Sequence, residues 1–520
     1  MSEELSDLLK VRREKLQNIR DLGINPYPYK FTPTEHSAKV LEKFASLAEG
    51  SDSSDTVVVA GRIMTKRGHG KASFATIQDE CGRLQVYAKL DVMGEEQYKI
   101  WQNLDMGDYI GVTGHVFRTK TNEITVRVEK LEVLSKSLLP LPEKWHGLQD
   151  KEIRYRERYL DLMVNPEVKE VFVKRSRVVC FFGHFLEQKG FLEVETPVLH
   201  VLQGGAAARP FETFHDALSM SLFMRIAPEL YLKRLLVGGF EKVFEMGRVF
   251  RNEGMSFKHN PEYTMIEIYQ AYADYHDIMQ LTENLVVSAA KEVLGTLEIE
   301  FRGEKIDLTP PWKKITLEDA LKENGIDIIG KTDDQIRALG KEKGIEGAME
   351  LGIGKIINEL YDKFVEPNLR QPTFIIDHPL ETSPLAKKHR SKEGKVERFE
   401  LIIAGMELAN AFSELNDPID QMERFNKQAE LKAAGDEEAE SMDEDFLRAL
   451  EYGMPPAGGL GIGIDRLVMI LTNSPSIRDV IFFPHMRPLA KAQPKKEEME
   501  TLTPNPSPRG RGAKNTNEGK

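Results

Sequence analysis

The chain has 520 residues, of which 41% are hydrophobic and 30% charged, and its formal net charge is −12. That length is too great for one compact domain, and the composition is ordinary for a globular protein. The charge excludes a uniformly basic nucleic-acid-binding protein, although a local basic patch is compatible with it. Two cysteines in the whole chain exclude a disulfide scaffold and a cysteine-rich zinc module, so a cytoplasmic protein is expected. No apolar run approaches the roughly 20 residues of a membrane span, so no membrane partner is expected.

Residues 1–50 are expected to form an N-terminal helical segment, in which Leu16, Ile19 and other apolar residues recur at helical spacing. The run Asn-Pro-Tyr-Pro-Tyr at 25–29 must end the helix, because a residue that precedes proline disfavours the α region. Basic residues, Arg12 and Lys15 among them, cover the other faces. Two interpretations stay open: a solvated amphipathic helix that packs on a neighbour, or a basic surface for an RNA.

Residues 51–138 are expected to form a five-stranded barrel. The strands are predicted at 56–64, 73–79, 83–88, 107–117 and 123–134, with a helix at 91–104 between the third and the fourth. This order is typical of an OB-fold, which binds oligonucleotides with basic and aromatic side chains. The candidate side chains on this surface are Arg62, Lys66, Arg67, Lys71, Phe74 and Gln85. Phe74 fits the barrel core equally well.

The rest of the chain divides into three parts. Residues 139–150 contain two prolines and are expected to be a linker. Residues 151–488 alternate helical and strand-like segments, with a charged helical insertion at about 275–370 and a further charged helix at 418–450. Residues 489–520 are rich in lysine, proline and glycine and are expected to be a disordered tail.

Two glycine-rich segments resemble nucleotide-binding motifs only superficially. The segment at 68–71 lacks the GxxxxGK[ST] spacing of a phosphate-binding loop, and no helix follows it. The glycines at 459, 461 and 463 lack the βαβ context of a dinucleotide-binding motif. Walker-type ATP chemistry and NAD chemistry are therefore not supported.

The segment 244–272 predicts a strand, a polar loop and a second strand. In the second strand Tyr263, Met265, Glu267 and Tyr269 share one face, because side chains alternate with a period of two. The loop before it contributes arginine and histidine side chains, which can hold phosphates above an aromatic ring. A surface hairpin with solvated charges is the alternative interpretation.

Carboxylates recur every seven residues in the segment 396–416, at Glu400, Glu407 and Glu414. They stand among apolar residues, and buried carboxylates require cationic partners. On one straight strand the side chains of Glu400 and Glu407 would point to opposite faces, because side chains alternate and seven is an odd number. The two carboxylates meet only if the chain turns near Ala404-Gly405. A third segment, 458–470, leads from glycines to Arg466 at a helix start, where an arginine can clamp a phosphate or stack on a base.

Three signatures in order resemble those of class II aminoacyl-tRNA synthetases. They are GFLEVETP at 190–197, FRNE at 250–253 and GIGIDR at 461–466. The segments GGAAARPF (204–211), RIAPELYLKR (225–234), ANAFSELNDP (409–418) and the N-terminal RREKL and NPYPYKF resemble the lysyl-tRNA synthetases of bacteria in particular. The resemblance covers about residues 8–487.

This resemblance implies an α+β multidomain protein with an antiparallel catalytic sheet flanked by helices, an anticodon-binding OB domain and a homodimer. It also implies a reaction in which the lysine carboxylate attacks the α-phosphate of ATP and the lysyl group then passes from lysyl-adenylate to tRNA(Lys). No general base is needed for the first step, because the carboxylate is already a nucleophile, so positioning and charge stabilisation suffice.

The resemblance assigns roles to particular residues. It implies that ATP is bound by Arg251, His259, Asn260, Tyr263 and Arg466, with the two arginines acting in catalysis. It implies a lysine pocket of Gly205, Glu229, Glu267, Tyr269, Asn410, Phe412 and Glu414, and a Mg²⁺ site at Glu400 and Glu407. It implies anticodon contacts from Phe74, Gln85, Arg62 and Glu123. Lys258 departs from the family, which commonly has arginine there.

Three other functions compete with lysine–tRNA ligation. A sister aspartyl or asparaginyl enzyme is disfavoured by the pocket carboxylates, which would repel aspartate and stay unpaired against an uncharged substrate. A lysyltransferase acting on elongation factor P is disfavoured by the barrel. An inactive paralogue is disfavoured because Arg251, Glu407 and Arg466 are all present.

Overall fold

The computed structural model describes residues 3–68, 70–142, 148–433 and 441–489. The chain divides into two compact units, Met1–Gln149 and Asp150–Lys520. Part of the predicted linker and nearly all of the predicted tail lie outside the described residues. None of the described helices combines the length and the apolar character that crossing a membrane requires.

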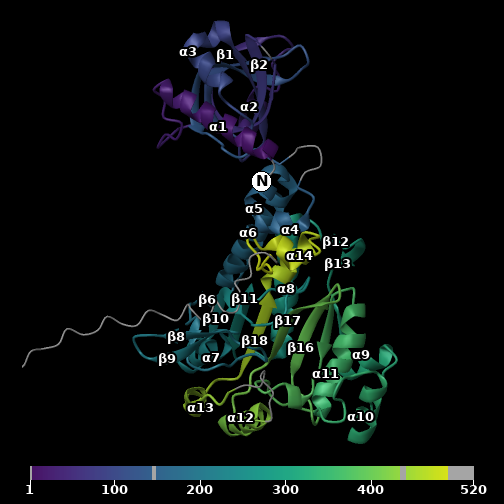
Figure 1. Cartoon of the computed structure of the whole chain (residues 1–520). Coiled ribbons are helices and arrows are strands. Elements are labelled where there is room, and N and C mark those ends of the chain that lie inside the picture. Colours follow the sequence, from purple (N-terminus) through teal and green to yellow (C-terminus); the bar gives the residue numbers. More distant parts are fainter. Residues whose placement is uncertain (1–2, 69, 143–147, 434–440, 490–520) are drawn as a thin grey trace, which may run out of the picture. The chain divides into compact units, whose positions relative to one another are not determined.

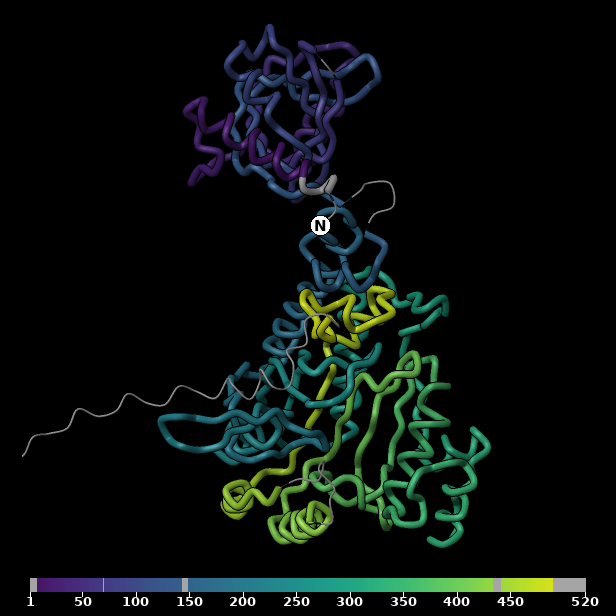
Figure 2. Tube along the Cα trace, viewed as in Figure 1, coloured from purple at the N-terminus to yellow at the C-terminus, as the bar shows by residue number. Residues whose placement is uncertain are grey.

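The first unit contains a closed barrel with the strand order β1-β2-β3-β5-β4. Its trace is the purple and blue part of the tube in Figure 2. Apolar side chains from the strands, among them Val59, Ile77 and Val126, are buried in the barrel core. The predicted OB-fold is confirmed. The elements are β1 (Asp52–Arg67), β2 (Ala72–Gln78), β3 (Arg83–Lys89), α3 (Leu90–Gln102), β4 (Tyr109–Arg118) and β5 (Ile124–Ser135).

The N-terminal segment forms α1 (Glu3–Asp21) and α2 (Ser37–Lys43). Ile19 is fully buried, and two basic residues of α1 serve the fold. The Arg12 guanidinium donates to the carbonyl groups of Ser137 and Met106, both at 3.0 Å, and the Lys15 ammonium lies 2.5 Å from Asp105. These contacts favour the packing interpretation of α1 over an RNA-binding surface made by Arg12 and Lys15.

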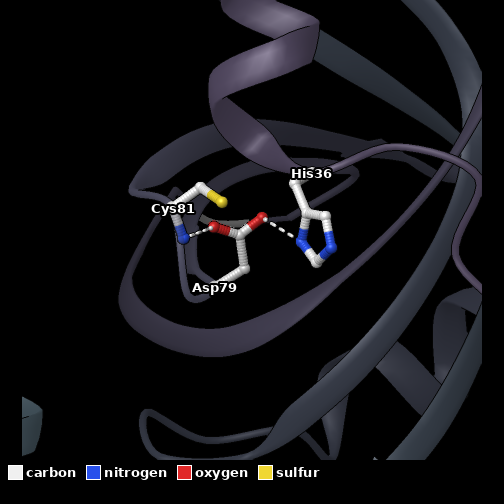
Figure 3. Close-up of side chains that lie close together, drawn as sticks. All are labelled: His36, Asp79 and Cys81. Atoms are coloured by element: carbon white, nitrogen blue, oxygen red, sulfur yellow. Dashed lines mark hydrogen bonds and ion pairs between the residues drawn. The ribbon is translucent and has the colours of Figure 1, made fainter. Parts of the chain in front are cut away.

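Asp79 connects the start of α2 to the turn between β2 and β3, beside His36 and Cys81 (Figure 3). Its carboxylate accepts hydrogen bonds from the amide and hydroxyl of Ser37, both at 2.6 Å, and from the amide of Cys81 at 2.8 Å. Burial raises the pKa of Asp79, but these hydrogen bonds outweigh it and lower the pKa overall. The carboxylate is thus occupied by protein donors, and the cluster serves the fold.

The second unit is built on an eight-stranded sheet with the order β14-β15-β16-β17-β18-β11-β10-β6, in which β18 runs through the middle (Figure 1). The sheet is antiparallel except at its two edges, where β14 pairs with β15 and β6 with β10 in parallel. Its strands are β6 (Leu192–Glu193), β10 (Lys242–Phe250), β11 (Glu262–Ala271), β14 (Lys313–Thr316), β15 (Thr373–Ile376), β16 (Arg398–Ile403), β17 (Met406–Ser413) and β18 (Ala457–Gly463). The predicted α+β fold class is confirmed.

Two smaller sheets and the remaining helices complete this unit. The sheets are β7-β9-β8 (Leu199–His200, Met220–Met224, Glu212–His215) and β12-β13 (Glu298–Phe301, Glu304–Asp307). The helices are α4 (Lys151–Arg156), α5 (Arg158–Val164), α6 (Pro166–Gln188), α7 (Glu229–Val237), α8 (Tyr275–Leu294), α9 (Leu317–Glu323), α10 (Asp333–Glu342), α11 (Ile353–Phe364), η1 (Glu366–Asn368), η2 (Leu380–Thr382), α12 (Pro418–Ala433), α13 (Glu444–Glu451), α14 (Ile464–Leu471) and α15 (Ile477–Val480).

The predicted helical insertion at 275–370 differs from the structure. Helix α8 belongs to the central core, because Ile278, Leu285 and Ala289 are fully buried in the cluster that packs on the sheet. Three short strands interrupt the segment, and only α9, α10 and α11 pack around a second, smaller core, which also includes Ile375 of β15 and Ile402 of β16. The charges of α8 lie on its exposed face, so composition alone did not distinguish a core helix from an inserted one. The predicted helix at 418–450 is two helices, α12 and α13.

Candidate active site

A cavity of about 630 Å³ lies on one face of the sheet in the second unit. Strands β11, β17 and β18 form its floor, so segments that are far apart in the sequence meet there. The predicted site residues that line it are Gly205, Glu229, Arg251, His259, Asn260, Tyr263, Glu267, Tyr269, Glu407, Asn410, Phe412 and Arg466. Glu400 and Glu414 do not line the cavity. Glu400 contacts Arg398, which lines the cavity, and Glu414 contacts Lys233, which does not.

The floor follows the predicted alternation. Tyr263, Met265, Glu267 and Tyr269 of β11 all face the cavity, and glycines of β18 lie opposite them. A Cβ atom at Gly459 would lie 1.9 Å from Oε1 of Glu414 and 2.6 Å from the Tyr269 ring. The glycine run that resembles a dinucleotide motif therefore keeps the floor of the cavity free of side chains.

One end of the cavity carries cationic and donor groups. The Nε atom of Arg251 is buried and has no hydrogen-bond partner among the described residues, and the guanidinium lies 5.6 Å from the centre of the Tyr263 ring. Arg466 begins α14 and donates to the carbonyl group of Glu407 at 2.6 Å. Because an unpaired buried donor is costly, Arg251 is poised for an anionic partner. We call this region the arginine end.

His259 and Asn260 stand in the loop that leads into β11. Burial, and then the charges of Arg466 and Lys258, lower the pKa of His259 to about 4, so its imidazole is neutral at pH 7. Its Nδ1 lies 2.8 Å from the hydroxyl of Ser256, which leaves Nε2 for a ligand. The Asn260 amide donates to the carbonyl group of Glu262 at 2.6 Å. Lys258, which departs from the family pattern, is paired with Glu366 at 2.7 Å.

Strands β16 and β17 form the predicted hairpin, with Ala404 and Gly405 in left-handed conformations at its turn. Arg398 contacts Oε1 of Glu400 at 2.6 Å, and Arg466 contacts Oε2 of Glu407 at 3.3 Å. Each carboxylate has a second oxygen outside these contacts. Burial raises the pKa of Glu400, and nearby carboxylates add to this effect, which signals an excess of negative charge. A hard divalent cation fits this set of oxygen atoms.

The other end of the cavity is rich in carboxylates, and we call it the carboxylate end. The Tyr269 hydroxyl donates to Oε2 of Glu267 at 3.0 Å, and burial next to Glu229 raises the pKa of Glu267 well above its usual range. Glu229 and Glu414 share a partner that the sequence analysis missed. The ammonium group of Lys233 lies 2.6 Å from Oε1 of Glu229 and 2.5 Å from Oε2 of Glu414.

Two family models and several known proteins match the chain. The family described as tRNA synthetases class II (D, K and N) matches residues 150–487, and the OB-fold nucleic acid binding domain matches residues 57–134. The lysine–tRNA ligase of Carboxydothermus hydrogenoformans is 59% identical over 488 residues, which cover 94% of this chain and 99% of that protein. Those of Moorella thermoacetica and Pelotomaculum thermopropionicum are 57% and 56% identical, covering 93% and 94% of this chain and 98% and 96% of theirs.

The chain belongs to the lysine–tRNA ligase family. The resemblance read from the three signatures is thus confirmed, and with it the class of enzyme. Class II synthetases use ATP, which fits a cavity with an arginine end beside an aromatic ring.

In the barrel of this member of the lysine–tRNA ligase family, some of the residues predicted to contact the anticodon lie close together. The Gln85 amide donates to Glu123 at 2.7 Å and accepts from the hydroxyl of Thr125 at 2.8 Å. Phe74 is half-buried, and its ring centre lies 4.5 Å from that of Tyr87. The outer surface around Phe74 is therefore aromatic, as base stacking requires.

Arg62 does not join this group. It lies opposite Gln78 of β2, four residues or roughly 13 Å along the strand from Phe74. Its guanidinium donates to the carbonyl group of Gly107 at 2.9 Å and lies 4.3 Å from the ring of Tyr109. The residue opposite Phe74 is Arg67, because a β-bulge between Ile63 and Thr65 shifts the register. The structure therefore separates Arg62 from Phe74, and a contact of Arg62 with the anticodon stays a prediction.

The sequence analysis missed functional neighbours on both sides of the cavity. Lys233 stands four residues after Glu229 in helix α7, and on a helix this spacing is a signal for a paired charge. Arg398 contacts both Glu400 and Asn410, the latter at 2.9 Å, and has no such local signal. Only the pairing of β16 with β17 places it there.

Proposed function

We propose that this chain ligates L-lysine to tRNA(Lys) through a lysyl-adenylate intermediate. The observation that carries the proposal is one cavity with an arginine end and a carboxylate end, in a member of this family. Lysine matches it, because its carboxylate and its two ammonium groups need partners of opposite sign.

In the first step an oxygen of the lysine carboxylate bonds to the α-phosphorus of ATP, and the bond from that phosphorus to pyrophosphate breaks. Arg251 holds the α-phosphate and the substrate carboxylate together, since it lines the cavity and its buried Nε has no partner among the described residues. Arg466 binds the γ-phosphate and covers the adenine opposite Tyr263. Neutral His259 donates a hydrogen bond to a phosphate oxygen, and Asn260 positions the same loop.

Glu400 and Glu407 are proposed to hold Mg²⁺, whose preference for oxygen ligands suits this pair. When bound, Mg²⁺ neutralises charge on the phosphate oxygens. Arg398 keeps Glu400 in place through the contact at 2.6 Å.

The lysine pocket is proposed to consist of Glu229, Glu267, Tyr269 and Glu414, walled by Gly205, Asn410 and Phe412. Carboxylates in a desolvated slot select a substrate with two ammonium groups. In the second step the terminal ribose hydroxyl of tRNA bonds to the lysyl carbonyl carbon, and AMP leaves. On the barrel, Phe74, Gln85, Glu123 and the repositioned candidate Arg67 are proposed to contact the anticodon.

The protein is further proposed to act as a homodimer in the cytoplasm. The segment around the first signature exposes Leu192, Leu199 and Val201, each about half accessible, and such apolar patches mark interfaces. Light scattering after size-exclusion chromatography should give twice the chain mass of 59.1 kDa. A monomeric mass at micromolar concentration would contradict the dimer.

The decisive experiment is ATP–pyrophosphate exchange with each of the twenty amino acids in the presence of Mg²⁺. Exchange with lysine alone is expected. Exchange with another amino acid would overturn the pocket assignment, and no exchange from folded protein would favour an inactive paralogue. Aminoacylation of tRNA(Lys) by the same preparation then tests the second step.

A further inference from the structure

Lys233 is a completely buried cation at the carboxylate end. It lies on α7, one turn after Glu229, and its side chain is 0% accessible. Its ammonium group also lies 5.3 Å from the ring centre of Phe412 and 6.0 Å from that of Phe446. No solvent screens these contacts, so the two carboxylates at 2.6 and 2.5 Å determine its energy.

Lys233 keeps its proton in this environment. Burial alone would lower the pKa of its ammonium, but the charges of Glu229 and Glu414 outweigh burial and raise it. A charged lysine inside a binding pocket for lysine requires a reason, because it competes with the substrate for the same carboxylates.

The charges of the pocket give that reason. Three buried carboxylates, those of Glu229, Glu267 and Glu414, stand at this end of the cavity, and the ammonium group of Lys233 pairs with the first and the last of them. When the substrate is bound and all three carboxylates are ionised, the remaining negative charge equals that of two carboxylates, and the substrate brings two ammonium groups. Its own carboxylate lies toward Arg251 in the proposed reaction. The occupied pocket is therefore electrically balanced only if Lys233 is counted.

We propose that Lys233 is a positioning residue that sets the charge of the lysine pocket and holds Glu229 and Glu414 in place for the substrate. This inference rests on the proposed function. Lys233 is assigned no contact with the substrate, because its ammonium group is held by Glu229 and Glu414 at 2.6 and 2.5 Å. A purely structural role, in which Lys233 only fastens α7 to the end of β17, is the alternative.

The two roles are distinguished by the variants K233M, E414Q and K233M/E414Q. Methionine keeps the length of the side chain and removes its charge. K233M leaves Glu229 and Glu414 without their shared cation, so the two buried carboxylates repel each other and either take up a proton or move out of place. Its KM for lysine in ATP–pyrophosphate exchange should therefore rise at least tenfold while its KM for ATP changes less than twofold. In the E414Q background the sign reverses, because removal of Lys233 restores the balance. K233M/E414Q should therefore have a KM for lysine at least threefold below that of E414Q.

A KM for lysine that K233M leaves unchanged, or that K233M raises in both backgrounds, would overturn the proposal. The comparison of E414Q with the double variant remains decisive if K233M alone does not fold. R234M is the matched control, because Arg234 is the next residue of α7 and pairs with Asp443 at 2.8 Å outside the lysine pocket. Its KM for lysine should change less than twofold. Lysine-dependent exchange by the unaltered protein tests the proposed function separately.

Discussion

The two ends of the active-site cavity meet their charge requirements in opposite ways. At the arginine end, the buried Nε of Arg251 has no protein partner within the described part of the chain. At the carboxylate end, Lys233 lies within 2.6 Å of both Glu229 and Glu414. The arginine end is thus completed by phosphate and carboxylate groups of the substrates, whereas the carboxylate end carries part of its counter-charge within the protein. A site can thus leave its counter-charge to the substrates where the transition state forms and supply part of it where the substrate is selected.

The largest expected effect is the loss of activity that follows a substitution at the arginine end. Replacing Arg251 with methionine should lower kcat/KM for ATP–pyrophosphate exchange by about 10²–10³-fold, because it removes a preorganised cation from the reacting phosphate. Steady-state exchange measures it, and an unchanged melting temperature serves as the control for folding. A loss below tenfold would mean that Arg466 suffices at this end.

The next effect tests the carboxylate end through a group that faces the substrate. Replacing Glu267 with glutamine should raise KM for lysine by roughly 10²-fold, because a charge-assisted hydrogen bond is lost. The KM for ATP should stay within twofold of its original value. Equal changes in both constants would show that Glu267 supports the sheet and does not select lysine.

A smaller effect is expected from a substitution in the first unit, which leaves both ends of the cavity unchanged. Replacing Phe74 with alanine should weaken aminoacylation of tRNA(Lys) by about tenfold, in line with the loss of one base–aromatic stack. ATP–pyrophosphate exchange, which needs no tRNA, should be unaffected. If both assays decline together, Phe74 acts mainly in the barrel core.

The smallest expected effect concerns pH. Because the pKa of His259 is lowered to about 4, this imidazole takes up a proton only as the pH falls toward 4. Between pH 8 and pH 6 the KM for ATP should therefore change less than twofold. A change centred near pH 6.5 that disappears in the variant His259→Asn would show that His259 titrates at its ordinary value and binds phosphate as a cation.

Local patterns predicted much of this protein correctly. The alternation of Tyr263, Glu267 and Tyr269 along one strand placed all three in the cavity, because period-two geometry is a property of the strand itself. The turn at Ala404-Gly405 was predictable for the same kind of reason, since a short glycine-containing segment between two β-forming runs closes a hairpin.

The sequence by itself determined the barrel strands, the two hairpins of the active site and the family. Only the tertiary structure decided that Lys233 lies against Glu414, that Arg67 and not Arg62 faces Phe74, and that α8 belongs to the core. The Lys233–Glu414 contact depends on elements distant in the chain, the placement of Arg67 opposite Phe74 depends on a β-bulge, and the role of α8 depends on burial. Their energies arise from packing and desolvation in the folded protein, so no local window of sequence contains them.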